Sequence, residues 1–180
     1  YYHESGWRGT LEKEGGGVCV NQAIHTLDLM LWFCGKRPAA VKASLDTRAH
    51  AIEVEDDASG MITFEDGTRA NFWFTNNNCT DSPVEIVLWC ENGTAKLVGD
   101  KAEIQLNDGS VLTAQNGDEV FRYGEMKNYW GFSHVRQISD YYNHLVHGEP
   151  LFVTCKDAFE THKVMCAILT SGRENRSVDL

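Results

Sequence analysis

Three predicted hairpin turns, each containing a glycine, constrain the fold of this chain more than any other sequence feature. Asp66, Asn92 and Asp108 are each followed by glycine, and each pair separates two segments in which apolar and polar side chains alternate. Asn-Gly and Asp-Gly tolerate the positive φ angles of tight hairpins, and a period of two is typical of strands. Successive hairpins predict an antiparallel, meandering sheet rather than βαβ units. The expected strands are 58–64 and 68–74, 84–90 and 95–98, and 102–106 and 111–114.

Helical periodicity flanks this region on both sides. A buried helix face is predicted between the three glycines at 15–17 and about Phe33, with apolar residues at i, i+4, i+7 and i+11: Val20, Ile24, Leu27 and Leu31. A strand is expected from about Ala39, and further helices over 133–147 and from Thr154. The sequence therefore predicts an α+β fold, in which a large, mostly antiparallel open sheet has helices packed on one face.

Composition narrows the classes of protein that this chain can belong to. Its 180 residues fit one domain, 1–180, and 42% hydrophobic with 23% charged residues is a globular composition. The net charge of −10 disfavours a nucleic-acid partner. No apolar stretch approaches the ~18 residues of a membrane span, and no signal peptide is recognisable. The six cysteines contain no C-x-x-C pair, so we expect no metal site and a cytoplasmic protein with reduced, mostly buried thiols.

A second stripe on the first helix carries the residues best suited to chemistry. Asn21, His25, Asp28 and Trp32 are spaced i, i+4, i+7 and i+11, beside the apolar stripe. A histidine that titrates near neutrality can exchange a proton with a substrate hydroxyl. The alternatives are a half-buried histidine with a purely structural role, or a zinc ligand. Zinc is disfavoured because no second histidine or glutamate lies four residues away.

Several motifs together resemble a known family. W-R-G-T at 7–10 is followed by G-G-G-V-C-V-N-Q-A-I-H-T-L-D at 15–28. E-D-D-A at 55–58, G-x-x-H-x-x-Q-x-x-D at 131–140 and D-A at 157–158 follow in order. This arrangement resembles the C-terminal domain of the Gfo/Idh/MocA oxidoreductases, the relatives of glucose–fructose oxidoreductase and inositol dehydrogenase.

The resemblance implies an NAD(P)-dependent dehydrogenase that oxidises a hydroxyl of a sugar, sugar derivative or cyclic polyol. It implies that His25 is the catalytic acid–base group, and that Asn21, where the family often has aspartate, positions a hydroxyl. It further implies substrate contacts from Asp28, Arg8 and His134. A surface ion pair for Arg8 and a helix-start residue without a chemical role for His134 are the alternatives.

The family's N-terminal Rossmann domain, with a lysine that shares the acid–base role, is expected to lie outside these residues. No G-x-G-x-x-G follows a strand here. We therefore expect NAD or NADP to bind the full-length enzyme, and the fragment alone to bind neither cofactor and to be inactive. The competing hypothesis is a non-catalytic sugar-binding or oligomerisation module. Aromatic residues in the strands, Phe72, Trp73, Phe74 and Trp89, predict a homo-oligomer that associates through the sheet face.

Overall fold

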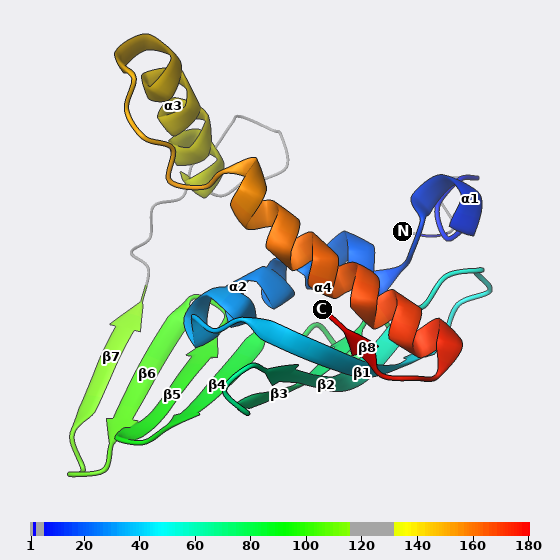
Figure 1. The fold of residues 1–180 in the computed structure, drawn as a ribbon, viewed down its shortest axis with the longest axis horizontal. Helices are drawn as coiled ribbons and strands as arrows, with labels where there is room; N and C mark the ends of the chain where they lie inside the picture. Colours follow the sequence, from blue (N-terminus) through cyan, green and yellow to red (C-terminus); the bar gives the residue numbers. More distant parts are fainter. Residues whose placement is uncertain (1, 3–5, 116–131) are drawn as a thin grey trace. The chain divides into compact units, whose positions relative to one another are not determined.

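The computed structural model describes residues 2, 6–115 and 132–180 (Figure 1). The chain separates into two compact units, which are described one at a time. The first comprises Tyr1–Ser82 and Cys155–Leu180, and the second comprises Pro83–Thr154. The assignment of 1–180 to a single domain stays a prediction. Gly131, which begins the G-x-x-H-x-x-Q-x-x-D motif, lies outside the described residues.

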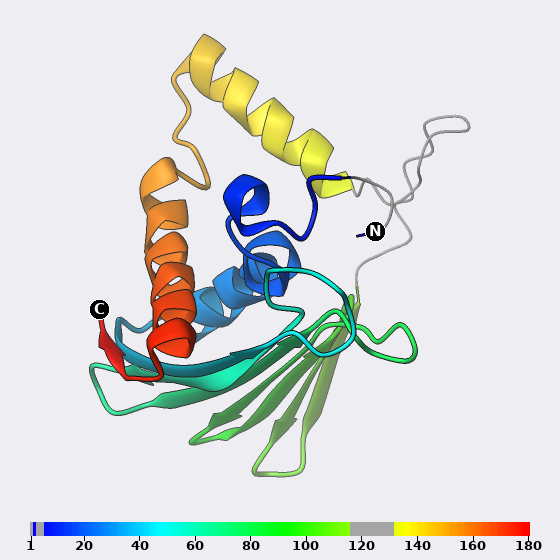
Figure 2. The same ribbon diagram turned by 90° about the vertical axis from the view of Figure 1, so that its right-hand side faces the viewer.

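The first unit packs two helices on an antiparallel sheet. The sheet has the order β3-β2-β1-β8. Helix α4 lies against β1, and α2 contacts α4 on the same side of the sheet (Figures 1 and 2). The elements are α1 (Leu11–Glu14), the π-helix η1 (Cys19–Ala23), α2 (Ile24–Cys34), β1 (Pro38–Asp46), β2 (Asp57–Phe64), β3 (Arg69–Thr75), α4 (Cys155–Glu174) and β8 (Val178–Asp179).

The core of this unit lies between the sheet and the two helices. Val41 and Ile62 from the strands, Leu27 from α2 and Ile168 from α4 are each at most 1% exposed. Burying an aliphatic side chain of this size contributes about 1.5–3 kcal/mol. Since α2 and α4 share one core, the helix that carries the candidate site is fixed by packing as well as by its own hydrogen bonds.

The helix predicted between the glycines and Phe33 forms, but its first turn is π-helical. Of the four predicted face residues only Leu27 is fully buried, and the other three pack half-buried against the core: Val20, Ile24 and Leu31. A π turn closes i→i+5 hydrogen bonds, so it shifts which residues face the core. The residues that this shift buries are Cys19, Ala23, Leu27 and Met30.

In its described residues, the second unit contains a four-stranded antiparallel sheet, order β4-β5-β6-β7, and one helix. Its elements are β4 (Glu85–Cys90), β5 (Gly93–Val98), β6 (Lys101–Leu106), β7 (Val111–Gln115) and α3 (Phe132–His147). All three predicted hairpins form, one in the first unit and two here. The predicted α+β class with antiparallel strands is confirmed, and hydrogen bonding divides the strands between two sheets of four.

The prediction of mostly buried thiols is wrong. Of the six cysteines, all of which lie within the described residues, only Cys19 is buried and Cys34 is half-buried. The four exposed thiols lie in a loop, at the end of an edge strand and on the outer face of α4: Cys79, Cys90, Cys155 and Cys166. These positions face away from the core irrespective of side-chain polarity.

Within the described part of the chain, no helix is long and apolar enough to cross a membrane.

Candidate active site

The predicted polar stripe lies on the outer side of η1 and α2. Asn21 is half-buried in η1, whereas His25 and Asp28 are exposed on α2. Among the described residues, none makes a hydrogen bond or ion pair with His25. The imidazole is therefore accessible to a ligand and is not tied up by the contacts of the fold.

Glu14 holds the Asn21 side chain. The Asn21 Nδ2 group donates to Glu14 Oε1, and the backbone N–H of Gly9 donates to Glu14 Oε2. An ionised carboxylate only accepts hydrogen bonds, so the amide must turn its NH₂ group toward Glu14. The Asn21 carbonyl oxygen, Oδ1, is left on the other branch of the amide.

The buried carboxylate of Glu55 caps the start of the helix that carries His25. Glu55 is 5% exposed, and its Oε1 accepts hydrogen bonds from the backbone N–H groups of Gly17 (2.8 Å) and Cys19 (3.1 Å). Its backbone oxygen accepts from the N–H of Val18 at 2.9 Å. A Cβ atom at Gly17 would lie 1.8 Å from that backbone oxygen. The glycine motif is thus required for the close approach of the E-D-D-A segment.

The same contacts decide whether the glycine motif suits a dinucleotide phosphate. Helix N-termini bind phosphate through backbone N–H groups that point at the anion. Here the N–H groups of Gly17 and Cys19 already bond the Glu55 carboxylate, whose charge would also repel a phosphate. This segment does not fit the phosphates of NAD or NADP.

Asp28 joins α2 to α4. The buried hydroxyl of Thr161 donates to Asp28 Oδ1 at 2.5 Å. One carboxylate oxygen of Asp28 therefore orients α2 on α4, whatever its second oxygen contacts. The predicted substrate contact of Asp28 stays a prediction.

The other two predicted substrate residues lie in different units. The Arg8 guanidinium lies 4.7 Å from the centre of the Trp7 ring, a cation–π distance. The next residue, Gly9, bonds the carboxylate that holds Asn21, so this turn and the Asn21 segment are tied together. His134 is exposed in the first turn of α3, in the second unit. The substrate roles of Arg8 and His134 stay predictions.

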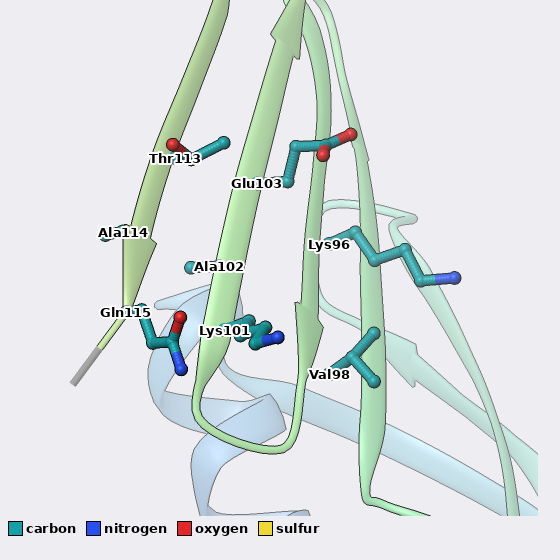
Figure 3. Close-up of a pocket in the computed structure, with 8 residues that line it drawn as sticks. All are labelled: Lys96, Val98, Lys101, Ala102, Glu103, Thr113, Ala114 and Gln115. Carbon is teal, nitrogen blue, oxygen red and sulfur yellow. The ribbon is translucent and has the colours of Figure 1, made fainter. Parts of the chain in front are cut away.

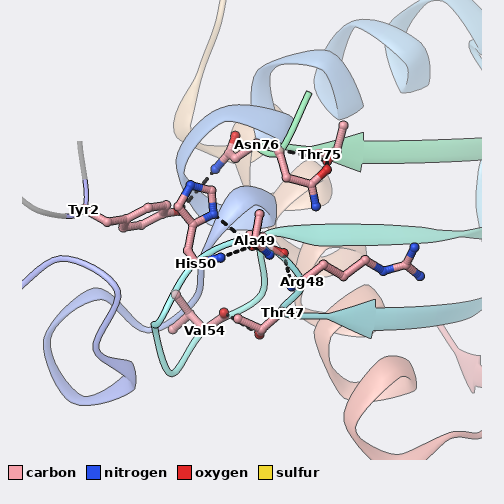
Figure 4. A network of polar contacts seen from close by, with 10 residues as sticks. Tyr2, Thr47, Arg48, Ala49, His50, Val54, Thr75 and Asn76 are labelled. Atoms are coloured by element: carbon pink, nitrogen blue, oxygen red, sulfur yellow. Dashed lines mark hydrogen bonds and ion pairs between the residues drawn. The ribbon is translucent and has the colours of Figure 1, made fainter. Parts of the chain in front are cut away.

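A second polar cluster includes Arg48, Ala49 and His50, in the loop after β1 (Figure 4). Asp56 is 0% exposed and accepts from the backbone N–H groups of Arg48 (2.8 Å), Ala49 (2.9 Å) and His50 (3.0 Å). The His50 ring atom Nδ1 lies 2.8 Å from Asp56 Oδ2. Burial alone would raise the pKa of the Asp56 carboxyl, but these hydrogen bonds outweigh it and lower the pKa. The cluster holds the loop after β1 in place.

Cys19, although two residues from Asn21, is not a candidate nucleophile. Burial, and after it the nearby Glu55 carboxylate, raises the pKa of the Cys19 thiol far above its ordinary value. Since the thiolate is the reactive form, this cysteine is inert.

The second unit has a hollow of about 400 Å³ on the face of its sheet, lined by residues of β5, β6 and β7 (Figure 3). Lys96, Lys101 and Glu103 supply its charges, and Lys96 also pairs with Glu85 at 3.2 Å. None of the predicted site residues lines it. No three His, Cys, Asp or Glu side chains in the described ranges are placed to hold a metal ion.

Comparison with known proteins identifies the class of protein that this fold and this stripe define. Residues 1–96 match the GFO/IDH/MocA C-terminal domain, and the chain belongs to the Gfo/Idh/MocA family of oxidoreductases. A search of the curated proteins gave no match.

Solved structures agree with this assignment over nearly the whole chain. A WlbA dehydrogenase from Chromobacterium violaceum, in complex with NADH and UDP-GlcNAcA, is 26% identical, with a TM-score of 0.79 over 100% of this chain and 50% of its own. An aldose-aldose oxidoreductase from Caulobacter crescentus, complexed with glycerol, is 22% identical, with a TM-score of 0.76 over 97% and 50%. A levoglucosan dehydrogenase, complexed with NADH and levoglucosan, is 18% identical, with a TM-score of 0.79 over 97% and 53%. The chain thus spans about half the length of these proteins.

The structure adds residues that no site prediction contained. Glu14, Glu55 and Asp56 hold the candidate site or its supporting loop, as described above. Glu55 and Asp56 belong to the E-D-D-A motif, whose acidic residues between apolar segments were a usable signal. Glu14 lies in the mainly charged segment L-E-K-E, and nothing in that segment distinguishes it from Glu12 as a candidate site residue.

Proposed function

We propose that this chain is the substrate-binding, C-terminal half of an NAD(P)-dependent dehydrogenase that oxidises a hydroxyl of a sugar, sugar derivative or cyclic polyol. The observation that carries the proposal is the exposed imidazole of His25, which has no hydrogen-bond or ion-pair partner among the described residues. It lies on a helical segment held at its start by Glu55 and at Asp28 by Thr161, in a member of an oxidoreductase family. Relatives were solved with glycerol, with levoglucosan and with a UDP-sugar, ligands that all carry hydroxyl groups.

In this proposal the residues of the stripe share the handling of one substrate hydroxyl. His25 takes the hydroxyl proton as the carbinol carbon is oxidised, which is general base catalysis. Asn21 Oδ1 accepts a hydrogen bond from a hydroxyl, and Asp28 and Arg8 bind others. NAD or NADP would take the hydride and would be bound by a domain outside this chain, because the glycine motif does not fit its phosphates.

The test is His25→Ala in the enzyme that joins this chain to its dinucleotide-binding domain. Turnover of sugars and polyols is measured with NAD and with NADP. Loss of a general base lowers kcat by at least about tenfold while the melting temperature is kept. His162→Ala, an exposed histidine on α4, is the matched control and should retain activity. Wild-type turnover by His25→Ala would contradict the assignment, and an inactive wild type would favour a binding or assembly module.

We further propose that the enzyme is a cytoplasmic homo-oligomer. The support for self-association is the exposure of aromatic residues on the strands. Trp73 on β3 is 63% exposed and Trp89 on β4 is 82% exposed. Exposed aromatic residues are enriched in subunit interfaces.

A further inference from the structure

We propose that Glu14 is a positioning residue of the candidate site, which holds the Asn21 amide so that its Oδ1 atom accepts a hydrogen bond from the substrate. This inference rests on the proposed function and assigns a role to a residue outside the predicted stripe. The amide orientation that Glu14 imposes also determines which kind of substrate group Asn21 can bind.

The Glu14 backbone is held before its side chain makes any contact with the site. Glu14 is the last residue of α1, and its N–H donates to Thr10 O at 3.0 Å. The next residue, Gly15, has φ of 79° and closes the turn with a hydrogen bond to Leu11 O at 3.0 Å. The carboxylate therefore starts from a fixed backbone.

Each carboxylate oxygen of Glu14 accepts a hydrogen bond from a different donor. Gly9, which is buried, donates its backbone N–H to Oε2, and Asn21 donates Nδ2 to Oε1. The contact with Gly9 prevents the carboxylate from turning away, so Oε1 stays directed at Asn21. The side chain is half-buried, which limits competition from water.

This arrangement decides which of the two possible amide orientations Asn21 adopts. The opposite orientation would point Oδ1 at a carboxylate oxygen, which places two acceptors in contact and leaves the NH₂ group without its ionic partner. Hydrogen bonds to a charged acceptor are stronger than those between neutral groups. Asn21 is therefore held as an acceptor on its free branch.

A fixed acceptor favours a ligand atom that carries a hydrogen. The group bound by Asn21 is therefore a hydroxyl or an N–H, and a carboxylate or phosphate at that position is rejected. An aspartate at this position would itself be a charged acceptor. Here the neutral amide accepts, and the negative charge lies one hydrogen bond further away, on Glu14.

The kinetic test uses Glu14→Gln in the enzyme that joins this chain to its dinucleotide-binding domain. The substrate is whichever of glycerol, levoglucosan, glucose and myo-inositol the wild type oxidises best. The introduced amide has one oxygen for two donors, so its NH₂ group opposes either Gly9 or Asn21. Asn21 then loses its fixed orientation. The hydrogen bond to Asn21 is made equally in the ground state and in the transition state. We therefore expect KM to rise by about tenfold or more and kcat to stay within about threefold.

Two variants distinguish this role from a general loss of structure. Glu12→Gln removes an exposed charge from the same short helix and should leave KM and kcat unchanged. In the double variant Glu14→Gln, Asn21→Asp, the introduced glutamine can accept from Gly9 and donate to the introduced carboxylate. The acceptor is restored, and KM should return to within about threefold of wild type, as coupled residues in a double-mutant cycle do. An unchanged KM in Glu14→Gln, or a double variant that is no better, overturns the proposal.

A spectroscopic readout separates this inference from the proposed function. The side-chain NH₂ signals of Asn21 are assigned in the 15N-labelled 180-residue chain by their loss in Asn21→Asp. They should shift in Glu14→Gln and not in Glu12→Gln, because the hydrogen bond from Nδ2 is to Glu14. Unmoved signals overturn the Glu14–Asn21 contact. If the signals shift in Glu14→Gln but the wild-type enzyme oxidises none of the substrates, the Glu14–Asn21 contact is supported and the dehydrogenase proposal is refuted.

Discussion

The carboxylates of Asp56 and Asp28 differ in role because they differ in burial and in the number of their hydrogen-bond donors. Asp56 is fully buried and surrounded by backbone N–H donors, so it acts on the fold. Asp28 is exposed, and its Oδ1 accepts a hydrogen bond from Thr161. Desolvation is tolerated only where hydrogen bonds replace water, which is why the buried carboxylate has several donors.

Asp56→Asn should destabilise the protein by about 2–3 kcal/mol near neutral pH, because an NH₂ group would face N–H donors. The folded-state pKa of Asp56 is lowered, so its contribution is present above the unfolded pKa of about 4 and is lost as pH falls through the folded value. The difference in unfolding free energy between wild type and variant should therefore narrow on acidification.

Urea unfolding between about pH 7 and pH 3 measures this difference. Asp81→Asn, at an exposed position, is the matched control and should track wild type throughout. A gap that stays constant down to the lowest pH would show that Asp56 ionisation does not contribute to stability.

At the scale of elements, the segment formed by η1 and α2 is held at two points. Glu55 caps its start, and Thr161 of α4 bonds Asp28 in its second half. His25 lies between these points, so its position depends on the sheet and on α4 together. A residue in an isolated helix of this length would have no such support, because short helices are marginal in water.

Gly17→Ala tests the first of these anchors. The added Cβ would lie 1.8 Å from the Glu55 backbone oxygen, and no side-chain rotation relieves a clash with backbone. We expect a loss of about 3 kcal/mol in unfolding free energy, at the upper end for overpacking. The measurement is the urea midpoint.

Gly6→Ala is the control for this substitution, since a Cβ at Gly6 meets nothing within 4 Å. It should unfold at the wild-type midpoint or slightly above. If Gly17→Ala unfolded at the wild-type midpoint, the close approach of the E-D-D-A segment would be wrong.

At the scale of the whole molecule, the chain spans about half the length of the solved relatives. Its own helix start binds a carboxylate where a dinucleotide-binding helix would bind phosphate. We therefore predict that calorimetric titration of this chain with NAD or NADP gives a Kd weaker than about 1 mM, equivalent to less than about 4 kcal/mol of binding. The same titration of the proposed full-length enzyme, in which a dinucleotide-binding domain is present, is the positive control. Micromolar binding by this chain alone would place a phosphate site within it.

Much of the fold was predictable because the relevant signals are local. Asp66, Asn92 and Asp108 with their glycines specify hairpins through positive φ angles, for example 84° at Gly67. The apolar spacing around Leu27 specifies a helix. The phase of the buried face was not predictable, since an apolar spacing read with the α-helical period does not include the i→i+5 turn of η1.

By itself, the sequence determined the α+β class, the hairpins, the order of the helices and the stripe that carries His25. These follow from periodicity and turn chemistry within a few residues of each other. Only the tertiary structure decided that Glu14 orients Asn21, that Glu55 caps the helix through Gly17, and that Asp28 bonds Thr161. The last two contacts join residues 38 and 133 positions apart, and neither is encoded by local spacing. Burial selects such partners, because a polar group removed from water must find a hydrogen bond wherever the fold provides one.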